Sequence, residues 1–173
     1  MQINIFPTTL WYLERDNRHP DDALNWALNH DESECVERSN RGGFQSPSRD
    51  FSEFPYLSYL QSVLEFLPAF NFVNWWVNIN RKGDYNLAHI HSGSDLSGVW
   101  YLTDNHEAPI HFISPFAYTR GELYNATGVL EGEYYMRCNA GDMLIFPSDL
   151  QHRVEPNPTE QPRVSIAFNL RLS

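Results

Sequence analysis

Residues 71–103 read NFVNWWVNINRKGDYNLAHIHSGSDLSGVWYLT. This stretch contains three runs rich in β-branched and aromatic residues, and short polar segments with glycine and aspartate separate them. Runs of this length and spacing are typical of strands in a β-sandwich or barrel. We therefore expect strands at 71–80, 85–91 and 96–103.

The chain beyond Pro68 continues this pattern. It predicts five further strands, at 108–115, 132–137, 141–147, 151–156 and 162–172. Eight short strands favour a mainly β, cupin-like jelly roll, because its barrel-like interior can hold a small ligand. The length of 173 residues suits one domain. We expect that domain to span 1–173, with 69–173 as its jelly-roll core.

Residues 1–68 are expected to support this core. INIFPTTLWYL (3–13) predicts an opening strand interrupted at Pro7. A short helix is expected to follow Pro20 and end near His30. Residues 31–50 are polar and turn-forming, which indicates a loop. A second helix is then indicated by leucines at steps of three and four, namely Leu57, Leu60, Leu64 and Leu67.

The composition limits the class of protein. The chain has 12 Lys and Arg against 22 Asp and Glu, a formal charge of −10, which argues against nucleic acid as a partner. No apolar run reaches the roughly 18 residues that a membrane span needs, and we recognise no signal peptide at the N-terminus. Cys35 and Cys138 have no CxxC partner, so we expect ordinary thiols. The expected location is the cytoplasm, or the host cytoplasm for a phage-encoded chain.

The histidines carry the first chemical signal. His89 and His91 form His-x-His within an expected strand, so both side chains point to one face. Two such imidazoles can bind one metal ion with little distortion of the backbone. His152 is the candidate third ligand, because the strand-and-turn pattern GDMLIFP (141–147) precedes it. The alternative for the His-x-His pair is surface histidines, or core histidines held by hydrogen bonds.

A second signal follows eleven residues after His152. Arg163 and Ser165 share one face of the expected strand 162–172. A guanidinium beside a hydroxyl is a good clamp for a carboxylate. The alternative is a surface cation. However, the same expected strand carries the apolar residues Val164, Ile166 and Phe168, and an unpaired arginine is seldom placed on a buried strand.

These motifs together resemble the 2-oxoglutarate/Fe(II)-dependent oxygenases. More closely, several segments are similar to a group of short oxygenases of bacteria and their phages. These segments are NRGGFQS (40–46), NWWVNINRKGDYNLAHIH (74–91), SGVWYL (97–102), GDMLIFPSDLQHRV (141–154) and RVSIAFN (163–169). The resemblance covers nearly the whole chain, from IFPTTL (5–10) onward. The fold of that family is the double-stranded β-helix, which agrees with the strand pattern.

The resemblance implies a ligand set and a cosubstrate clamp. His89 and His152 correspond to iron ligands, and Arg163 corresponds to the residue that binds the distal carboxylate of 2-oxoglutarate, assisted by Ser165. Most members carry a carboxylate where this chain has His91. With three neutral ligands and bound 2-oxoglutarate, the formal charge at Fe(II) would be zero instead of −1. We favour His91 as the third ligand, with Asp95 as the alternative.

Four further residues are candidates for the cosubstrate pocket. In related oxygenases the strand before the His-x-His motif supplies polar contacts to 2-oxoglutarate, which suggests this role for Asn78 and Asn80. Tyr101 and Asn169 are candidates for the same pocket. The alternative is that these polar groups find partners in the backbone or at a sheet edge.

The activity implied is oxidation of a peptide side chain or a small metabolite, by hydroxylation, with succinate and carbon dioxide as coproducts. Two other functions stay open. One is a three-histidine cupin dioxygenase that does not use 2-oxoglutarate, which would leave Arg163 and Ser165 without a ligand. The other is a metal-free, non-catalytic interaction barrel. A homodimer is also left open.

The entrance to such a site has two candidate features. The loop 40–50 is long and Gly-rich enough to act as a lid, or it is a passive connector. Aromatic residues either line the entrance or belong to the core. They are Phe44, Trp75, Trp76, Tyr85 and Trp100.

Overall fold

The computed structural model describes residues 8–116 and 132–173. Within these residues the strands form two sheets in which all pairs are antiparallel. The larger sheet has the order β1 (Trp11–Leu13), β9 (Met143–Pro147), β6 (Leu96–Tyr101), β11 (Arg163–Leu172), β4 (Phe70–Asn80), β3 (Phe44–Gln45). The smaller sheet has the order β2 (Asn40–Arg41), β5 (Tyr85–His89), β10 (His152–Val154), β7 (Ile110–Ile113), β8 (Glu133–Met136).

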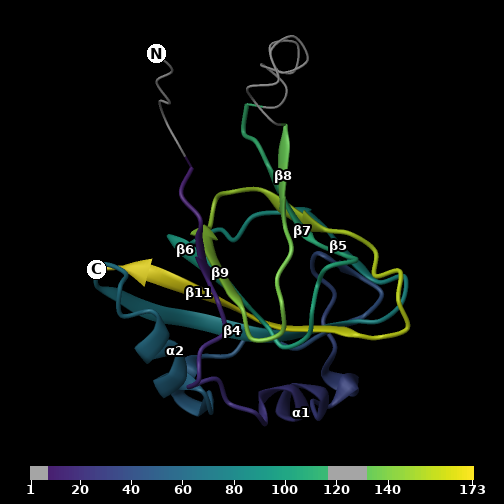
Figure 1. Cartoon of the computed structure of the whole chain (residues 1–173), viewed down its shortest axis with the longest axis horizontal. Helices are drawn as coiled ribbons and strands as arrows, with labels where there is room; N and C mark the ends of the chain where they lie inside the picture. Colours follow the sequence, from purple (N-terminus) through teal and green to yellow (C-terminus); the bar gives the residue numbers. More distant parts are fainter. Residues whose placement is uncertain (1–7, 117–131) are drawn as a thin grey trace.

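The helices cover one side of the larger sheet. Figure 1 shows α1 (Ala23–Leu28) and α2 (Leu57–Val63) on one side of β4 and β11, with β5, β7 and β8 on the other side. This layering confirms the predicted mainly β, double-stranded fold with two supporting helices. None of the described helices has the length and apolar character needed to cross a membrane.

The eight strands expected beyond Pro68 are all present, but several boundaries differ. The strand expected at 85–91 ends at His89, because His91 leaves β5 and donates its backbone N–H to Ser148 O (2.8 Å). Of the expected strand 3–13, Trp11–Leu13 is formed, and residues 3–7 lie outside the described residues. Both helices end earlier than expected: α1 ends at Leu28 instead of near His30, and α2 ends at Val63, so Leu67 is buried beyond its end.

The segment expected to be a loop at 31–50 is paired to both sheets. It contains a short 3-10 helix, η1 (Glu32–Glu34), followed by β2 and β3, and a second 3-10 helix, η2 (Phe51–Glu53), comes directly after it. β2 pairs with β5 and β3 pairs with β4, so the turn between them bridges the two sheets at one edge. Gly43, in this turn, has φ +65°, and a Cβ there would lie 2.9 Å from Ile79 O. Glycine is therefore required for this close approach.

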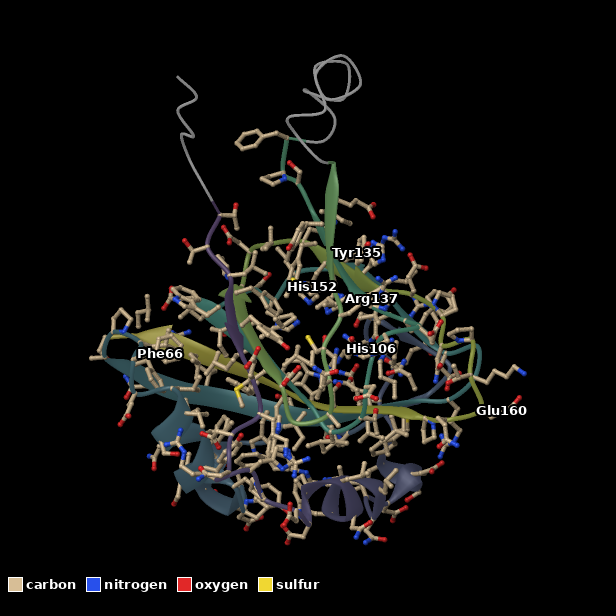
Figure 2. All side chains as sticks on the ribbon, in the orientation of Figure 1. Phe66, His106, Tyr135, Arg137, His152 and Glu160 are labelled. Carbon is tan, nitrogen blue, oxygen red and sulfur yellow. The ribbon has the colours of Figure 1, made fainter. Side chains whose placement is uncertain are left out.

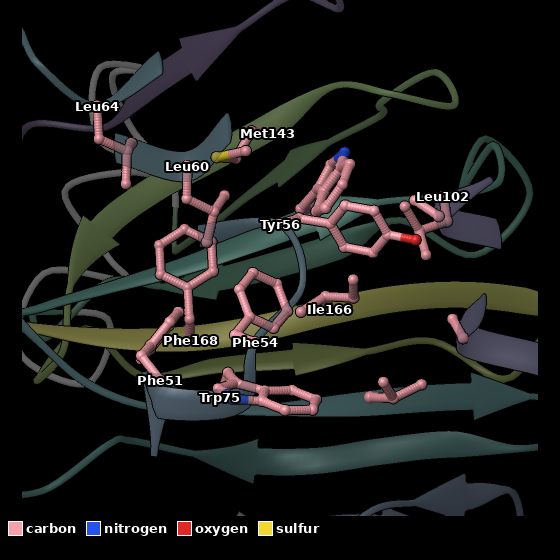
Figure 3. Packing of buried hydrophobic residues seen from close by; sticks show 14 of the residues in the cluster. Phe51, Phe54, Tyr56, Leu60, Leu64, Trp75, Leu102, Met143, Ile166 and Phe168 are labelled. Atoms are coloured by element: carbon pink, nitrogen blue, oxygen red, sulfur yellow. The ribbon is translucent and has the colours of Figure 1, made fainter. Parts of the chain in front are cut away.

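Alternate residues of the central strands form an apolar core under the helices. Val164, Ile166, Phe168 and Leu170 of β11 are fully buried, and they pack in one cluster with residues of β4, β6, β9 and α2. Figure 3 shows Phe168 and Ile166 beside Phe54 and Trp75 in this cluster. Burial of each such side chain contributes about 1.5–3 kcal/mol. The Phe168 ring occupies the space where a Cβ of Gly98 would lie.

The opposite face of the same strands is polar and faces the smaller sheet. β11 places Arg163, Ser165 and Asn169 there, opposite Asn80, Asn78 and Asn74 of β4. The rest of the space between the sheets is filled by a second apolar cluster, which includes Ile110, Phe112, Leu144 and Phe146. The interior is thus divided into an apolar half and a polar half.

Candidate metal and cosubstrate site

Three histidines meet at one end of the polar half. Candidate ligand atoms of His89, His91 and His152 all lie within 4.8 Å of one another. His152, the first residue of β10, is the register partner of His89 at the end of β5. His91 lies beyond the strand, yet its Nε2 is 3.3 Å from the Nε2 of His89. Figure 2 shows His152 within the body of the fold. The structure therefore brings together the three predicted imidazoles.

Each imidazole has an acceptor for its Nδ1–H. His89 Nδ1 donates to Leu87 O (2.7 Å) and His152 Nδ1 donates to Leu150 O (2.9 Å). His91 Nδ1 donates to Asn169 Oδ1 (2.9 Å) and lies 2.8 Å from Ser97 Oγ. Donation by Nδ1 leaves the Nε2 lone pair of each ring available for a metal ion, which is the arrangement that such outer hydrogen bonds fix.

Burial keeps these imidazoles neutral. It lowers the pKa of His91 to about 4 and the pKa of His152 to about 3, and it also lowers the pKa of His89. Neutral imidazole nitrogens are suitable ligands for divalent iron and related metals. The donor set therefore fits a divalent transition metal.

The alternative ligand Asp95 lies outside this group. Its Oδ2 accepts a hydrogen bond from the backbone N–H of Leu172 (2.9 Å), at the end of β11. Among the described residues, the cluster of metal-ligating side chains at this site consists of histidines alone.

A buried polar network stands behind His91. Asn169 Oδ1 accepts from His91 and from Ser97 Oγ (2.8 Å), and Asn169 Nδ2 donates to Asn74 Oδ1 (2.8 Å). Ser97 Oγ also lies 2.8 Å from Ser148 Oγ. Asn169, expected in the cosubstrate pocket, thus has both amide atoms engaged in orienting His91. Asn74, Ser97 and Ser148 were not predicted from the sequence. The one signal for them is the spacing of Asn74 relative to Asn78 and Asn80, at even steps along one strand.

A small cavity of about 50 Å³ extends from the histidines between the two sheets. We call it the inner cavity. Register places Ser165 between Asn78 of β4 and Tyr101 of β6. The predicted residues that line this cavity, besides the three histidines, are Asn78, Asn80, Tyr101, Arg163 and Ser165.

Arg163 lies in this cavity without a counter-ion. Arg163 is only 5% exposed. Its Nη1 donates to the backbone carbonyl oxygens of Ala108 (3.0 Å) and Glu155 (3.4 Å). Within the described residues no carboxylate forms an ion pair with it. Burial lowers its pKa to about 10, so it stays charged at neutral pH. A buried, unpaired charge is costly, and an anionic ligand would remove that cost.

Other polar groups of the inner cavity are available to a ligand. The side chains of Asn78 and Ser165 make no hydrogen bond with the described residues, although both line the cavity. Burial raises the pKa of Tyr101 far above its usual range, so its hydroxyl remains protonated.

Asn80 differs because it begins a chain of hydrogen bonds. Asn80 Nδ2 donates to Asn86 Oδ1 (3.3 Å), and Asn86 Nδ2 donates to Ser39 Oγ (3.2 Å). Ser39 Oγ lies 3.4 Å from His89 Nε2. Ser39 and Asn86 were not predicted, because their proximity depends on the pairing of β2 with β5.

A second, larger cavity of about 1030 Å³ is also lined by His89 and His91. We call it the outer cavity. Its lining comes from residues 36–39 and 87–92, with Gln45, Pro47, Ser48, Trp76 and Asn169. Of the predicted entrance aromatics, Trp76 lines both cavities, and its ring centroid is 5.2 Å from that of His91. Phe44, Trp75 and Trp100 belong to the core instead.

The fold and the motifs match known proteins. A family model described as "Putative 2OG-Fe(II) oxygenase" matches residues 74–169, more than half of the chain. No curated protein matches the chain by sequence.

Several solved structures share the fold at low sequence identity. HygX from Streptomyces hygroscopicus, with nickel and 2-oxoglutarate bound, has a TM-score of 0.66 and 12% identity, covering 96% of this chain and 84% of its own. EctD from S. alaskensis with bound Fe has a TM-score of 0.65 and 16% identity, covering 95% and 73%. SnoN, an alpha ketoglutarate dependent epimerase from nogalamycin biosynthesis, has a TM-score of 0.65 and 12% identity, covering 95% and 78%.

Proposed function

Because this chain belongs to the 2OG-Fe(II) oxygenase family, we propose that His89, His91 and His152 bind the ferrous ion and that Arg163 binds the distal carboxylate of 2-oxoglutarate. The chain is an oxygenase that uses Fe(II) and 2-oxoglutarate. One observation carries the assignment of residues. A cavity has three converging imidazoles at one end and a buried guanidinium without a carboxylate partner at the other.

This arrangement fits the chemistry of a keto-diacid. 2-Oxoglutarate has a metal-chelating keto acid at one end and a free carboxylate at the other. Arg163 would bind that carboxylate by charge-assisted hydrogen bonds, with the Ser165 hydroxyl as a further donor. The Asn78 amide and the Tyr101 hydroxyl would contact the molecule between its ends. Asn169 has a different role in this proposal, as the acceptor that orients His91.

When bound, the metal and 2-oxoglutarate would let dioxygen act as the oxidant: one oxygen atom would go to the hydroxylated substrate and the other to succinate, with loss of carbon dioxide. The protein contributes position and shielding. The Nδ1 hydrogen bonds hold the three rings in one orientation. Phe112 and Phe146 pack near His152, with ring centroids 6.1 and 4.8 Å from it, and they exclude water from this side.

The substrate would approach through the outer cavity. This cavity is lined by His89 and His91 but not by Arg163, which lines the inner cavity. We propose a small metabolite or a peptide side chain as substrate and the whole chain, 1–173, as the catalytic domain. HygX, which shares the fold, has also been solved with hygromycin B bound. We place the enzyme in the cytoplasm, where free thiols such as Cys35 and Cys138 persist.

Anaerobic titration with Fe(II) tests this proposal. A visible charge-transfer band should appear only when both Fe(II) and 2-oxoglutarate are present. His91→Ala should weaken metal binding, whereas Asp95→Asn should leave the band unchanged. Metal uptake without a response to 2-oxoglutarate would favour a three-histidine dioxygenase of another kind, and absence of uptake would favour a non-catalytic barrel.

A further inference from the structure

The charges around the two cavities are few and unequal. The charged side chains that line them are Glu37 and Arg38 in the outer cavity and Arg163 in the inner one. The Glu37 carboxylate lies 3.4 Å from Arg41 Nη1, so it is already paired. The side chain of Arg38 forms no ion pair or hydrogen bond with the described residues. A chain with a formal charge of −10 therefore presents an unpaired cation at the entrance to its metal site.

The outer cavity also has an apolar part. Leu87 and Ile90, on either side of His89, are 41% and 47% exposed, and both line this cavity. Val36 lies on the facing segment, next to Glu37 and Arg38. Large apolar side chains exposed together beside a site mark a surface that a ligand covers.

We propose that the outer cavity binds a substrate with a carboxylate attached to an apolar group. Arg38 binds the carboxylate, and Leu87 and Ile90 contact the apolar group. This inference rests on the proposed function, because it makes the outer cavity the substrate side of the metal centre. A cationic substrate finds no unpaired carboxylate in the described lining, and a purely apolar one would leave Arg38 unused.

The two guanidinium groups then have separate ligands. Arg163 is buried and reached through the inner cavity, whereas Arg38 is exposed and lines the outer one. Ser39, next to Arg38, lies within 3.4 Å of His89 Nε2. A carboxylate bound by Arg38 would therefore lie near the metal centre, because the next residue, Ser39, contacts the proposed ligand His89. The apolar group of the substrate is then the part that is oxidised.

The test uses N-acetyl-leucine and its neutral amide, N-acetyl-leucinamide, as probes. Both are titrated into the metal-free, isotope-labelled chain, and binding is followed by backbone amide shifts of residues 87–92. N-acetyl-leucine should bind more tightly than the amide. Arg38→Ala should weaken binding of N-acetyl-leucine by about three- to tenfold, as expected for a charge-assisted but solvent-exposed contact. It should leave the affinity for N-acetyl-leucinamide unchanged. Arg38→Lys should recover part of the loss.

Arg137→Ala is the matched control, because it removes another exposed arginine, which stacks on Tyr135 and lines neither cavity. Arg163→Ala should also leave binding of N-acetyl-leucine unchanged, since that guanidinium belongs to the inner cavity. The proposal is overturned if the acid and the amide bind equally, if neither binds, or if Arg38→Ala has no more effect than Arg137→Ala. Adding Fe(II) and 2-oxoglutarate to the same preparation and measuring the charge-transfer band separates this failure from a failure of the metal assignment.

Discussion

The two faces of the larger sheet are made by the same strands, yet they carry different side chains. On β11, Val164, Ile166, Phe168 and Leu170 face the helices, and the residues between them face the inner cavity and the histidines. The first set is apolar without exception. The second set includes Arg163, Ser165 and Asn169.

This difference shows how the fold separates stability from chemistry. The helix-facing side chains lose water on folding and stabilise the sheet. The cavity-facing ones include a buried cation and polar groups without protein partners, which is a cost to stability. A rigid apolar layer one residue away offsets that cost and fixes the positions of the polar groups. We therefore expect substitutions on the two faces to have opposite effects.

The largest effect on stability is expected for Phe168→Ala on the helix-facing side. Loss of this fully buried ring should reduce the free energy of unfolding by about 3–5 kcal/mol. Ser165→Ala on the cavity side should change it by less than about 1 kcal/mol. Urea denaturation of the metal-free proteins measures both values. Equal losses in the two variants would contradict the separation of the faces.

Arg163→Ala, on the cavity side, should reduce cosubstrate binding without reducing stability. The affinity for 2-oxoglutarate should fall by about tenfold to a hundredfold, because a charge-assisted contact in a buried site is lost. Stability of the metal-free chain should not decrease, since the variant removes a buried charge without a carboxylate partner. Calorimetric titration of 2-oxoglutarate into the Zn(II)-loaded chain measures the first value. Retention of the wild-type affinity would show that the cosubstrate carboxylate binds elsewhere.

Asn169→Ala tests the network behind His91. It should weaken metal binding by about tenfold or more, as outer hydrogen bonds to metal-binding histidines commonly do. It should also change the nitrogen shifts of the His91 ring in the metal-free chain, because Nδ1 loses its acceptor. Asn169→Asp keeps an acceptor and should preserve the Nδ1-protonated form. If the nitrogen shifts of the His91 ring are unchanged in Asn169→Ala, then Asn169 does not orient that ring.

The smallest expected effect is the alkylation of Cys138, which lies in the apolar cluster between the sheets. Burial raises the pKa of the Cys138 thiol to about 12, so at pH 8 it is almost wholly protonated and unreactive. Cys35 is exposed. Iodoacetamide should therefore modify Cys35 first, and Cys138 only in the presence of denaturant. Mass spectrometry follows both sites, and rapid modification of native Cys138 would indicate that this half opens.

The sequence predicts best those strands in which apolar and polar residues alternate. β4 and β11 each present one apolar and one polar set, so the faces of Arg163, Ser165 and Asn78 could be predicted. His89 and His152 were also predicted to meet, and they are register partners.

What could not be predicted depends on long-range pairing. β2 and β3 are two residues each and exist because they pair with β5 and β4. Local sequence does not encode such short strands, so the proximity of Ser39 to His89 was missed. The hydrogen bond from His91 to Asn169 was also not predicted, because an inward-facing amide can contact either a ligand or a neighbouring histidine. The bonds of Asn169 to Ser97 and Asn74 likewise depend on how the strands pair, and local sequence does not give that pairing.

The turn at Gly42 and Gly43 has a consequence for engineering. It attaches the neighbouring segment to both sheets, and residues 36–39 extend from it along the outer cavity. The metal ligands and Arg163 come from other strands. Residues 36–38 can therefore be exchanged while the metal ligands and Arg163 are kept, which makes these three residues the natural place to change the substrate specificity of the enzyme.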